Sequence, residues 1–127
     1  MDGPRRRLVV CDDDASVRRV VGILAEGVGY EVVGEAATAI EAEWFVWHTR
    51  PHVLVLDLAL QGISGLEVIV SMRATAPETV VIVFTAFDSM GAAAARAGAF
   101  AVVRKDEPDK LEDALQRAST TWRAMPP

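Results

Sequence analysis

Short runs of apolar residues alternate along the whole chain with segments in which apolar residues recur at helical spacing. The runs are rich in valine, isoleucine and leucine, which is typical of strands that are covered on both faces. The run that contains Glu31 and Glu35 is more polar and predicts a weaker strand. The five predicted strands cover residues 8–11, 30–36, 53–56, 80–84 and 100–103.

A helix is predicted after each strand, and most helix ends carry recognisable start or stop residues. The expected starts are Asp14, Thr38, a capping box at Ser64 and Glu67, Asp88, and Pro108, and the expected stops are Gly29, Pro51 and Gly98. The apolar helix positions are Val17, Val20, Val21, Leu24 and Val28, then Ile40, Trp44 and Trp47, then Leu66, Ile69 and Val70, and finally Leu111, Leu115, Ala118 and Trp122. We expect the three tryptophans to lie in the core rather than at an interface.

The alternation of strands and helices predicts an α/β fold, a doubly wound parallel sheet of five strands with helices on both faces. The crossovers between parallel strands should be right-handed. In such sheets the ligand site lies beyond the carboxyl ends of the strands, where the strand order reverses. The residues that directly follow the strands are therefore the candidates for function.

Length and composition fit a single globular domain. The chain has 127 residues, 51% hydrophobic and 24% charged, and we assign all of residues 1–127 to one domain with a core over about 7–120. The net charge of −5 argues against binding to nucleic acid or to an anionic membrane. The apolar runs fall short of the ~18 residues of a membrane-spanning helix, and residues 8–11 are too few for the core of a signal peptide.

Cys11 is the single cysteine of the chain, so an internal disulfide and a paired-cysteine metal site are excluded. We expect it to be a small buried apolar side chain, in a protein of the reducing cytoplasm. His48 and His52 flank Pro51, away from the predicted carboxyl ends of the strands. We expect both histidines to be surface residues rather than metal ligands or phosphoryl acceptors.

Polar and charged residues follow four of the five predicted strands. They are Asp12, Asp13 and Asp14 after the first strand, Asp57 after the third, Thr85 after the fourth, and Arg104 and Lys105 after the fifth. If the strand order brings these ends together, carboxylates, a hydroxyl and an ammonium group meet at one edge of the sheet. Clustered carboxylates repel one another unless a cation lies among them, and Mg²⁺ is a hard cation that prefers such oxygen ligands.

This combination of groups suits the transfer of a phosphoryl group. A carboxylate held near a metal ion can attack phosphorus as a nucleophile. The metal ion and the lysine would neutralise the charge on the phosphoryl oxygens. The threonine hydroxyl could then bond to one of these oxygens.

Five sequence blocks resemble the signature of response-regulator receiver domains, the CheY-like switches of two-component signalling. The resemblance covers roughly residues 7–120, and the blocks are residues 10–14, 54–58, 84–86, 97–99 and 103–105. It implies a flavodoxin-like (βα)5 fold with the strand order 2-1-3-4-5. It also implies a phospho-accepting switch module that has no separate substrate to turn over.

The resemblance assigns a role to each residue at the strand ends. Asp57 would take a phosphoryl group from a phosphohistidine of a sensor histidine kinase or a phosphotransfer protein. Lys105 would pair with the phosphoryl oxygens, and Thr85 would move toward them as the switch. The implied Mg²⁺ ligands are Asp57, Asp13, Asp12 through a bridging water, and the backbone carbonyl of Ala59, whereas Asp14 would cap a helix.

The resemblance also implies the partners of the domain. These are the kinase and an output domain or target protein, with no nucleic acid bound by this domain itself and a homodimer left open. The domain would promote only its own phosphorylation, from a kinase or a small acyl phosphate, and its own dephosphorylation. In the family, the output face is normally formed by the fourth helix, the fifth strand and the fifth helix.

Four features depart from the family pattern. Asp106 stands where a proline usually follows the lysine, so we expect a trans peptide bond there. Residues 60–65 replace the usual loop after the acceptor, and Val102 replaces the aromatic residue that rotates with the switch threonine. The segment that ends at Gly98 is short and contains Gly91, so we expect an atypical or mobile fourth helix.

Three other interpretations stay open. The chain could be a pseudo-receiver that acts only through protein contacts. Val102, the short fourth segment and the altered loops favour this, whereas the intact acids and the lysine argue against it. It could be a phosphohydrolase with an aspartyl nucleophile, but this class needs a second acid where Ala59 stands. It could be a fragment of a longer regulator, because residues 32–36 and the pair at 105–106 resemble DNA-binding regulators. Phe87 either tunes the access of water to the phosphate or simply packs.

Overall fold

The computed structural model describes residues 5–60, 64–86 and 89–124 of the chain, with side chains up to residue 120. Five parallel strands form one sheet in the order β2-β1-β3-β4-β5, which confirms the predicted fold class and strand order. The strands are β1 (Arg6–Cys11), β2 (Tyr30–Ala36), β3 (Val53–Leu56), β4 (Val80–Thr85) and β5 (Ala101–Arg104). β2 and β3 have the predicted bounds, and the other three differ only at their ends.

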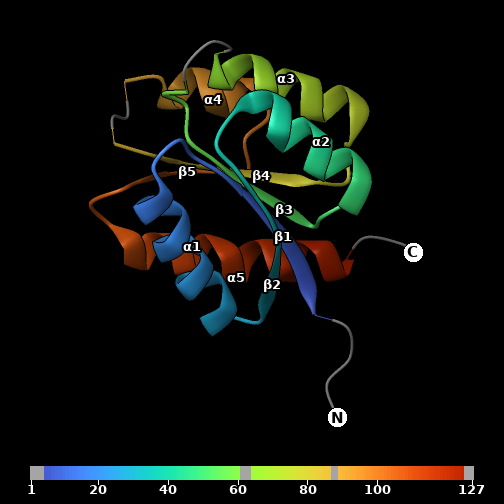
Figure 1. Ribbon diagram of the computed structural model, residues 1–127, viewed down its shortest axis with the longest axis vertical. Helices are drawn as coiled ribbons and strands as arrows, with labels where there is room; N and C mark the ends of the chain where they lie inside the picture. Colours follow the sequence, from blue (N-terminus) through green and yellow to red (C-terminus); the bar gives the residue numbers. More distant parts are fainter. Residues whose placement is uncertain (1–4, 61–63, 87–88, 125–127) are drawn as a thin grey trace.

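Helices cover both faces of the sheet (Figure 1). α1 (Ala15–Gly27) and α5 (Pro108–Ala124) lie on one face, whereas α2 (Ala39–Thr49), α3 (Gly65–Thr75) and α4 (Gly91–Ala97) lie on the other. Alternate residues of a strand point to opposite faces, so the central strands supply two separate cores. Val9, Cys11, Leu54 and Leu56 face α2 to α4, and Leu8, Val10, Val53 and Val55 face α1 and α5.

The helix starts follow the predicted capping residues. The Asp14 carboxylate accepts a hydrogen bond from the Ser16 N–H at 2.8 Å, as an N-cap should. Thr38 caps α2 through the Glu41 N–H at 3.2 Å. Ser64 caps α3 through Leu66, one residue earlier than the predicted capping box requires.

The predicted apolar side of α2 is wrong. The helix buries Ala39, Ala42 and Val46 against the sheet, whereas Ile40, Trp44 and Trp47 are 70%, 55% and 59% exposed. Apolar residues occupy both sides of α2, and the side with the small alanines packs closest. Val20 on α1 and Val70 on α3 were also expected inward and are exposed, and the side chain of Trp122 lies outside the described residues.

The fourth helix is short, as expected. α4 spans seven residues, begins after Met90 with no capping side chain, and ends at Gly98, whose φ of 116° suits glycine. The expected cap at Asp88 lies outside the described residues, as does Phe87. Within the described residues no peptide bond is cis, which agrees with the trans bond expected between Lys105 and Asp106. In the same part of the chain, no helix is both long and apolar enough to cross a membrane.

Candidate functional site

The strand register places Asp12 and Asp57 side by side at the carboxyl edge of the sheet. Cys11 at the end of β1 pairs with Leu56 at the end of β3, so the next residue of each strand is an aspartate. The ladder continues one step further, because the Asp57 N–H donates to the Cys11 carbonyl at 3.0 Å. Two adjacent parallel strands thus fix the positions of both carboxylates.

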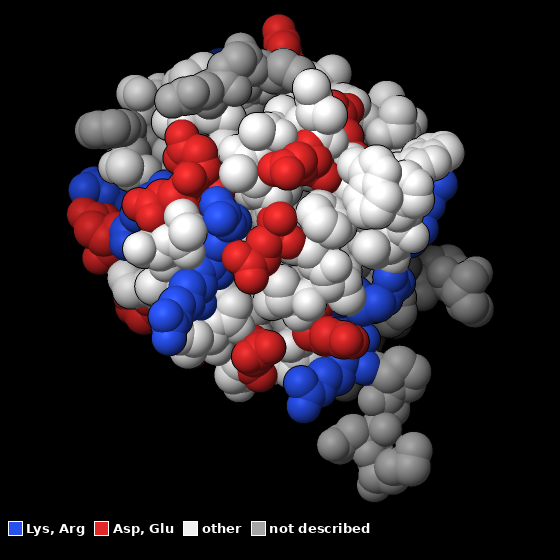
Figure 2. Space-filling view, viewed as in Figure 1, with Lys and Arg blue, Asp and Glu red and all other residues white. Residues whose placement is uncertain are grey.

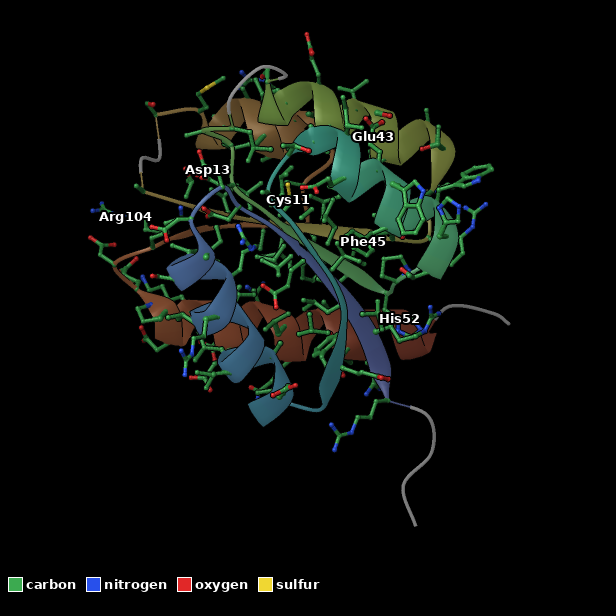
Figure 3. The ribbon with its side chains drawn as sticks, viewed as in Figure 1. Cys11, Asp13, Glu43, Phe45, His52 and Arg104 are labelled. Carbon is green, nitrogen blue, oxygen red and sulfur yellow. The ribbon has the colours of Figure 1, made fainter. Side chains whose placement is uncertain are left out.

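A third carboxylate completes a cluster of oxygen ligands. Asp12, Asp13 and Asp57 each offer an oxygen atom, and these atoms all lie within 4.8 Å of one another. The Asp12 and Asp57 residues are 2% and 4% exposed, whereas Asp13 is exposed to solvent. Figure 3 shows Asp13 at the carboxyl edge of the sheet, in the loop between β1 and α1. A half-open set of carboxylate oxygens of this size suits a hard divalent cation.

Lys105 brings a positive charge to the two buried carboxylates. Its Nζ lies 2.7 Å from Asp12 Oδ2 and 3.3 Å from Asp57 Oδ2. Its backbone N–H donates to the Thr85 carbonyl at 2.8 Å, which ties the end of β5 to the end of β4. Thr85 itself is 2% exposed. Asp12, Asp13, Asp57, Thr85 and Lys105, at the ends of four strands, therefore do lie at one edge of the sheet.

The Lys105 ammonium and the Asp12 carboxylate change each other's pKa. Burial alone would lower the pKa of Lys105, but the hydrogen bond to Asp12 and the charge of Asp57 raise it overall. Burial raises the pKa of Asp12, and the hydrogen bonds from Lys105 and from the Asp14 N–H oppose that rise only in part. Burial and the charges of Asp12 and Asp57 raise the pKa of the Cys11 thiol to about 12. This thiol is therefore a neutral core side chain, as predicted.

Backbone N–H groups hold the other oxygen of each buried carboxylate. Asp57 Oδ1 accepts a hydrogen bond from the Ala59 N–H at 3.1 Å. Asp12 Oδ1 accepts one from the Asp14 N–H at 2.9 Å. Each carboxylate is thus oriented by a backbone donor two residues further on while its second oxygen faces Lys105, which preorganises the pair.

Arg18 on α1 also contacts the site, and sequence reasoning missed it. Its Nη1 donates to the Asp12 carbonyl at 2.6 Å, and its Nε lies 3.3 Å from Glu35 Oε1 on β2. The guanidinium therefore anchors the β1–α1 loop to the neighbouring strand. The position of Arg18, in the first turns of the helix that follows the three aspartates, could have indicated this contact.

Other candidate residues lie away from the cluster. Arg104 pairs with Asp106, with Nη2 2.7 Å from Oδ2. His48 is exposed and stacks on Trp44. His52 is half-buried at the opposite end of the sheet, where its Nδ1 accepts a hydrogen bond from the Arg7 N–H at 2.8 Å (Figure 3). The prediction of two surface histidines is thus confirmed for His48 and only half right for His52.

Val102 lies on β5, on the side of the sheet that α4 covers. It is partly buried against the core below α2 to α4. A Cβ on Gly91 would lie 3.5 Å from Val102 Cγ1, so the first residue of α4 already packs on this side chain.

Several known proteins are similar to this chain in sequence. The family profile of the response regulator receiver domain matches residues 8–116. The transcriptional regulatory protein BtsR of Salmonella typhi is 37% identical over 113 residues, which cover 87% of this chain and 47% of BtsR. The DNA-binding response regulator MtrA of Mycobacterium tuberculosis is 34% identical over 92 residues, covering 71% of this chain and 39% of MtrA.

A solved structure has the same fold over most of the chain. The two-component response regulator of the LuxR family from Aurantimonas sp. superposes with a TM-score of 0.84 at 31% identity, covering 92% of this chain and 87% of that one. The chain spans about half the length, or less, of the curated relatives described above.

Proposed function

The chain belongs to the family of response regulator receiver domains, and we propose that Asp57 is its phospho-acceptor, supplied by a phosphohistidine of a sensor histidine kinase. The observation that carries this proposal is the pairing of the buried Asp57 carboxylate with Lys105 Nζ at 3.3 Å, within a cluster of three carboxylates. A structural carboxylate would gain nothing from two acidic neighbours, because like charges at this distance repel one another.

The groups around Asp57 suit an in-line transfer. A carboxylate oxygen of Asp57 forms the new bond to phosphorus while the P–N bond of the phosphohistidine breaks, and the imidazole leaves with the electron pair. Lys105 is placed to bind the phosphoryl oxygens, as the resemblance implies, and its raised pKa keeps it charged. The Ala59 N–H holds the carboxylate in a fixed orientation during the attack.

The same residues fit a bound Mg²⁺ ion. Asp13 and Asp57 would bind it directly, Asp12 through a water molecule, and the Ala59 backbone carbonyl would add a neutral oxygen. When bound, the ion supplies positive charge that offsets the phosphoryl oxygens and the carboxylates. Because Lys105 lies 2.7 Å from Asp12 Oδ2 and 3.3 Å from Asp57 Oδ2, it shares these carboxylates with any bound cation.

Thr85 is the switch residue of the proposal. Its hydroxyl would bond to a phosphoryl oxygen once Asp57 is modified, and this pulls on the end of β4. Val102 has no ring to rotate inward behind it. The signal therefore passes through the backbone of β4, β5 and the short α4, not through an aromatic side chain.

The proposed module works with other proteins. We take residues 1–127 as one receiver domain that acts on an output domain or a target protein. The domain promotes only its own phosphorylation and dephosphorylation. The name of the longer relative MtrA describes it as DNA-binding. For this chain, DNA binding would require an output domain of that kind.

Intact-mass spectrometry tests the proposal. The protein is incubated with Mg²⁺ and acetyl phosphate, and one added phosphoryl group is expected. The adduct should disappear in Asp57→Asn and with EDTA. It should persist in Asp14→Asn, whose carboxylate caps α1 in the same loop. No adduct on the wild type, together with no binding of beryllofluoride, would overturn the proposal and favour a receiver that acts by protein contacts alone.

A further inference from the structure

The exposed side of α2 carries three large apolar residues, Ile40, Trp44 and Trp47, which we call the α2 apolar face. These residues are 70%, 55% and 59% exposed. Figure 2 shows an area of uncharged side chains over α2, with acidic side chains beside it. Tryptophan is among the residues most enriched at the energetic centres of protein interfaces.

The fold does not need this face. α2 already packs on the sheet through Ala39, Ala42 and Val46, which are all buried. Phe45 adds a contact with β2, because a Cβ on Gly34 would lie only 2.5 Å from its ring. The α2 apolar face therefore takes no part in the core and is exposed to solvent in the isolated chain.

Neighbouring side chains hold both indole rings in place. Trp44 stacks on His48 with the ring centroids 4.0 Å apart and meets the edge of Phe45 at 5.3 Å. The Arg50 guanidinium lies 4.4 Å from the centroid of the Trp47 ring. Rings that are already fixed lose little conformational entropy when a partner covers them, which favours association.

The apolar area of the α2 apolar face is large enough to form the centre of a small protein interface. Tryptophan buries about 150–250 Å² when fully covered, so the two rings still offer on the order of 200–250 Å². Ile40 raises this to roughly 300 Å² per copy, or about 600 Å² when two copies meet. A standard interface buries about 1,600 Å², of which somewhat more than half is apolar. Two copies of the face thus supply about two thirds of that apolar area, with the polar rim still to add.

The charges at the two ends of α2 are complementary to those of a second, antiparallel α2, and Glu43 between them accepts a hydrogen bond from Ser71 Oγ at 2.9 Å. Glu41 lies in its first turn, and His48 and Arg50 lie at its end. An antiparallel pair places the acidic start of each helix opposite the basic end of the other, and it also opposes the two helix dipoles. The same pairing sets Ile40 opposite Trp47. Trp47 borders a groove of about 160 Å³ between α2 and α3, lined also by Val46 and Met72, into which an isoleucine can pack.

We propose that the α2 apolar face binds the same face of a second copy of this chain, with the two α2 helices antiparallel. The dimer is symmetric, because each copy gives the other the same residues. Its expected dissociation constant is on the order of tens of micromolar, in keeping with its modest area. The association does not require phosphorylation, so it stands or falls independently of the role of Asp57.

Sedimentation velocity over about 5–500 µM protein tests the proposal. The wild type and Asp57→Asn should both shift from monomer to dimer. Trp47→Glu should raise the dissociation constant at least about tenfold, because it puts a charge at the centre of the interface. The matched control is Ile23→Glu on α1, on the other face of the sheet, where the side chain is 64% exposed. This control should dimerise as the wild type does, and far-UV circular dichroism checks that both variants fold.

A charge exchange tests the antiparallel arrangement. Glu41→Arg and Arg50→Glu should each weaken self-association, because each places like charges opposite one another. An equimolar mixture of the two variants should recover the dimer, since the heterodimer restores opposite charges at both contacts. A wild type that stays monomeric to about 500 µM, or an equal loss in Ile23→Glu, would overturn the proposal. Failure of the mixture to dimerise would overturn the antiparallel pairing.

Discussion

Lys105 holds together two carboxylates that are buried in the fold, so its removal should destabilise the protein in a way that Mg²⁺ can repair. The Lys105→Met change keeps most of the apolar stem and removes the ammonium. Asp12 and Asp57, 2% and 4% exposed, then lose a cation at 2.7 and 3.3 Å from their oxygens and repel each other without compensation. Their mutual repulsion rises because little water screens them.

The size of the effect follows from burial. Removing one partner of a buried ion pair costs about 3–5 kcal/mol. The Lys105 side chain is 21% exposed, and solvent near the ammonium screens part of the interaction, so we expect a loss of about 2–3 kcal/mol. For a domain of this size that loss lowers the urea midpoint by about 1–2 M. The Lys110→Met control removes an exposed i,i+3 pair with Glu107 and should cost less than about 0.5 kcal/mol.

Urea unfolding with EDTA and with saturating Mg²⁺ is the assay. Mg²⁺ should stabilise both the wild type and Lys105→Met, by RT ln(1 + [Mg²⁺]/Kd). It should stabilise Lys105→Met more, because in this variant the metal no longer shares Asp12 and Asp57 with an ammonium group. The difference between the two proteins should therefore shrink when Mg²⁺ is added. The reasoning is refuted if Lys105→Met loses no more stability than Lys110→Met, or if Mg²⁺ leaves the difference unchanged.

Three further predictions concern the metal ligands, acid stability and the packing below α2. Asp13→Asn should weaken Mg²⁺ binding by roughly tenfold or more in calorimetry, since it removes one charged ligand, and unchanged affinity would exclude Asp13 as a ligand. Burial, with the charges of Arg7 and Arg6, lowers the pKa of His52, so the fold favours its neutral form. The hydrogen bond to neutral His52 contributes about 1 kcal/mol, which is present above the unfolded pKa near 6.5 and lost as pH falls below it. In urea unfolding between pH 7.5 and 5.5, the free energy of unfolding of His52→Ala should therefore depend less on pH than that of the wild type. Parallel curves for the two proteins would contradict this. Gly34→Ala should lower the free energy of unfolding by about 1–2 kcal/mol, because the added Cβ would lie 2.5 Å from the Phe45 ring, whereas Gly22→Ala inside α1 should be neutral or stabilising.

Residues at the strand ends could be predicted because their positions depend on strand order and register. Once β1 and β3 are parallel neighbours and Cys11 pairs with Leu56, Asp12 and Asp57 must lie beside each other. The same argument places Thr85 and Lys105 at the carboxyl edge of the sheet. Arg18 was missed because its contact with the Asp12 carbonyl depends on a side-chain conformation, not on a strand end. The side chain of Arg104, the last residue of β5, turns to Asp106 instead of the cluster, and this too depends on side-chain conformation.

The orientation of α2 could not be predicted, because it depends on a competition between two apolar sides of one helix. The tryptophans carry more apolar area, and area alone would bury them. Ala39, Ala42 and Val46 lie on the opposite side and let the helix approach the sheet closely, while Phe45 fills the space above Gly34. Burying Trp44 and Trp47 instead would hold the helix further from the sheet, and the close contact of the Phe45 ring with Gly34 would be lost. Close packing therefore decides which side of α2 faces the sheet, and the larger side chains remain available for another surface.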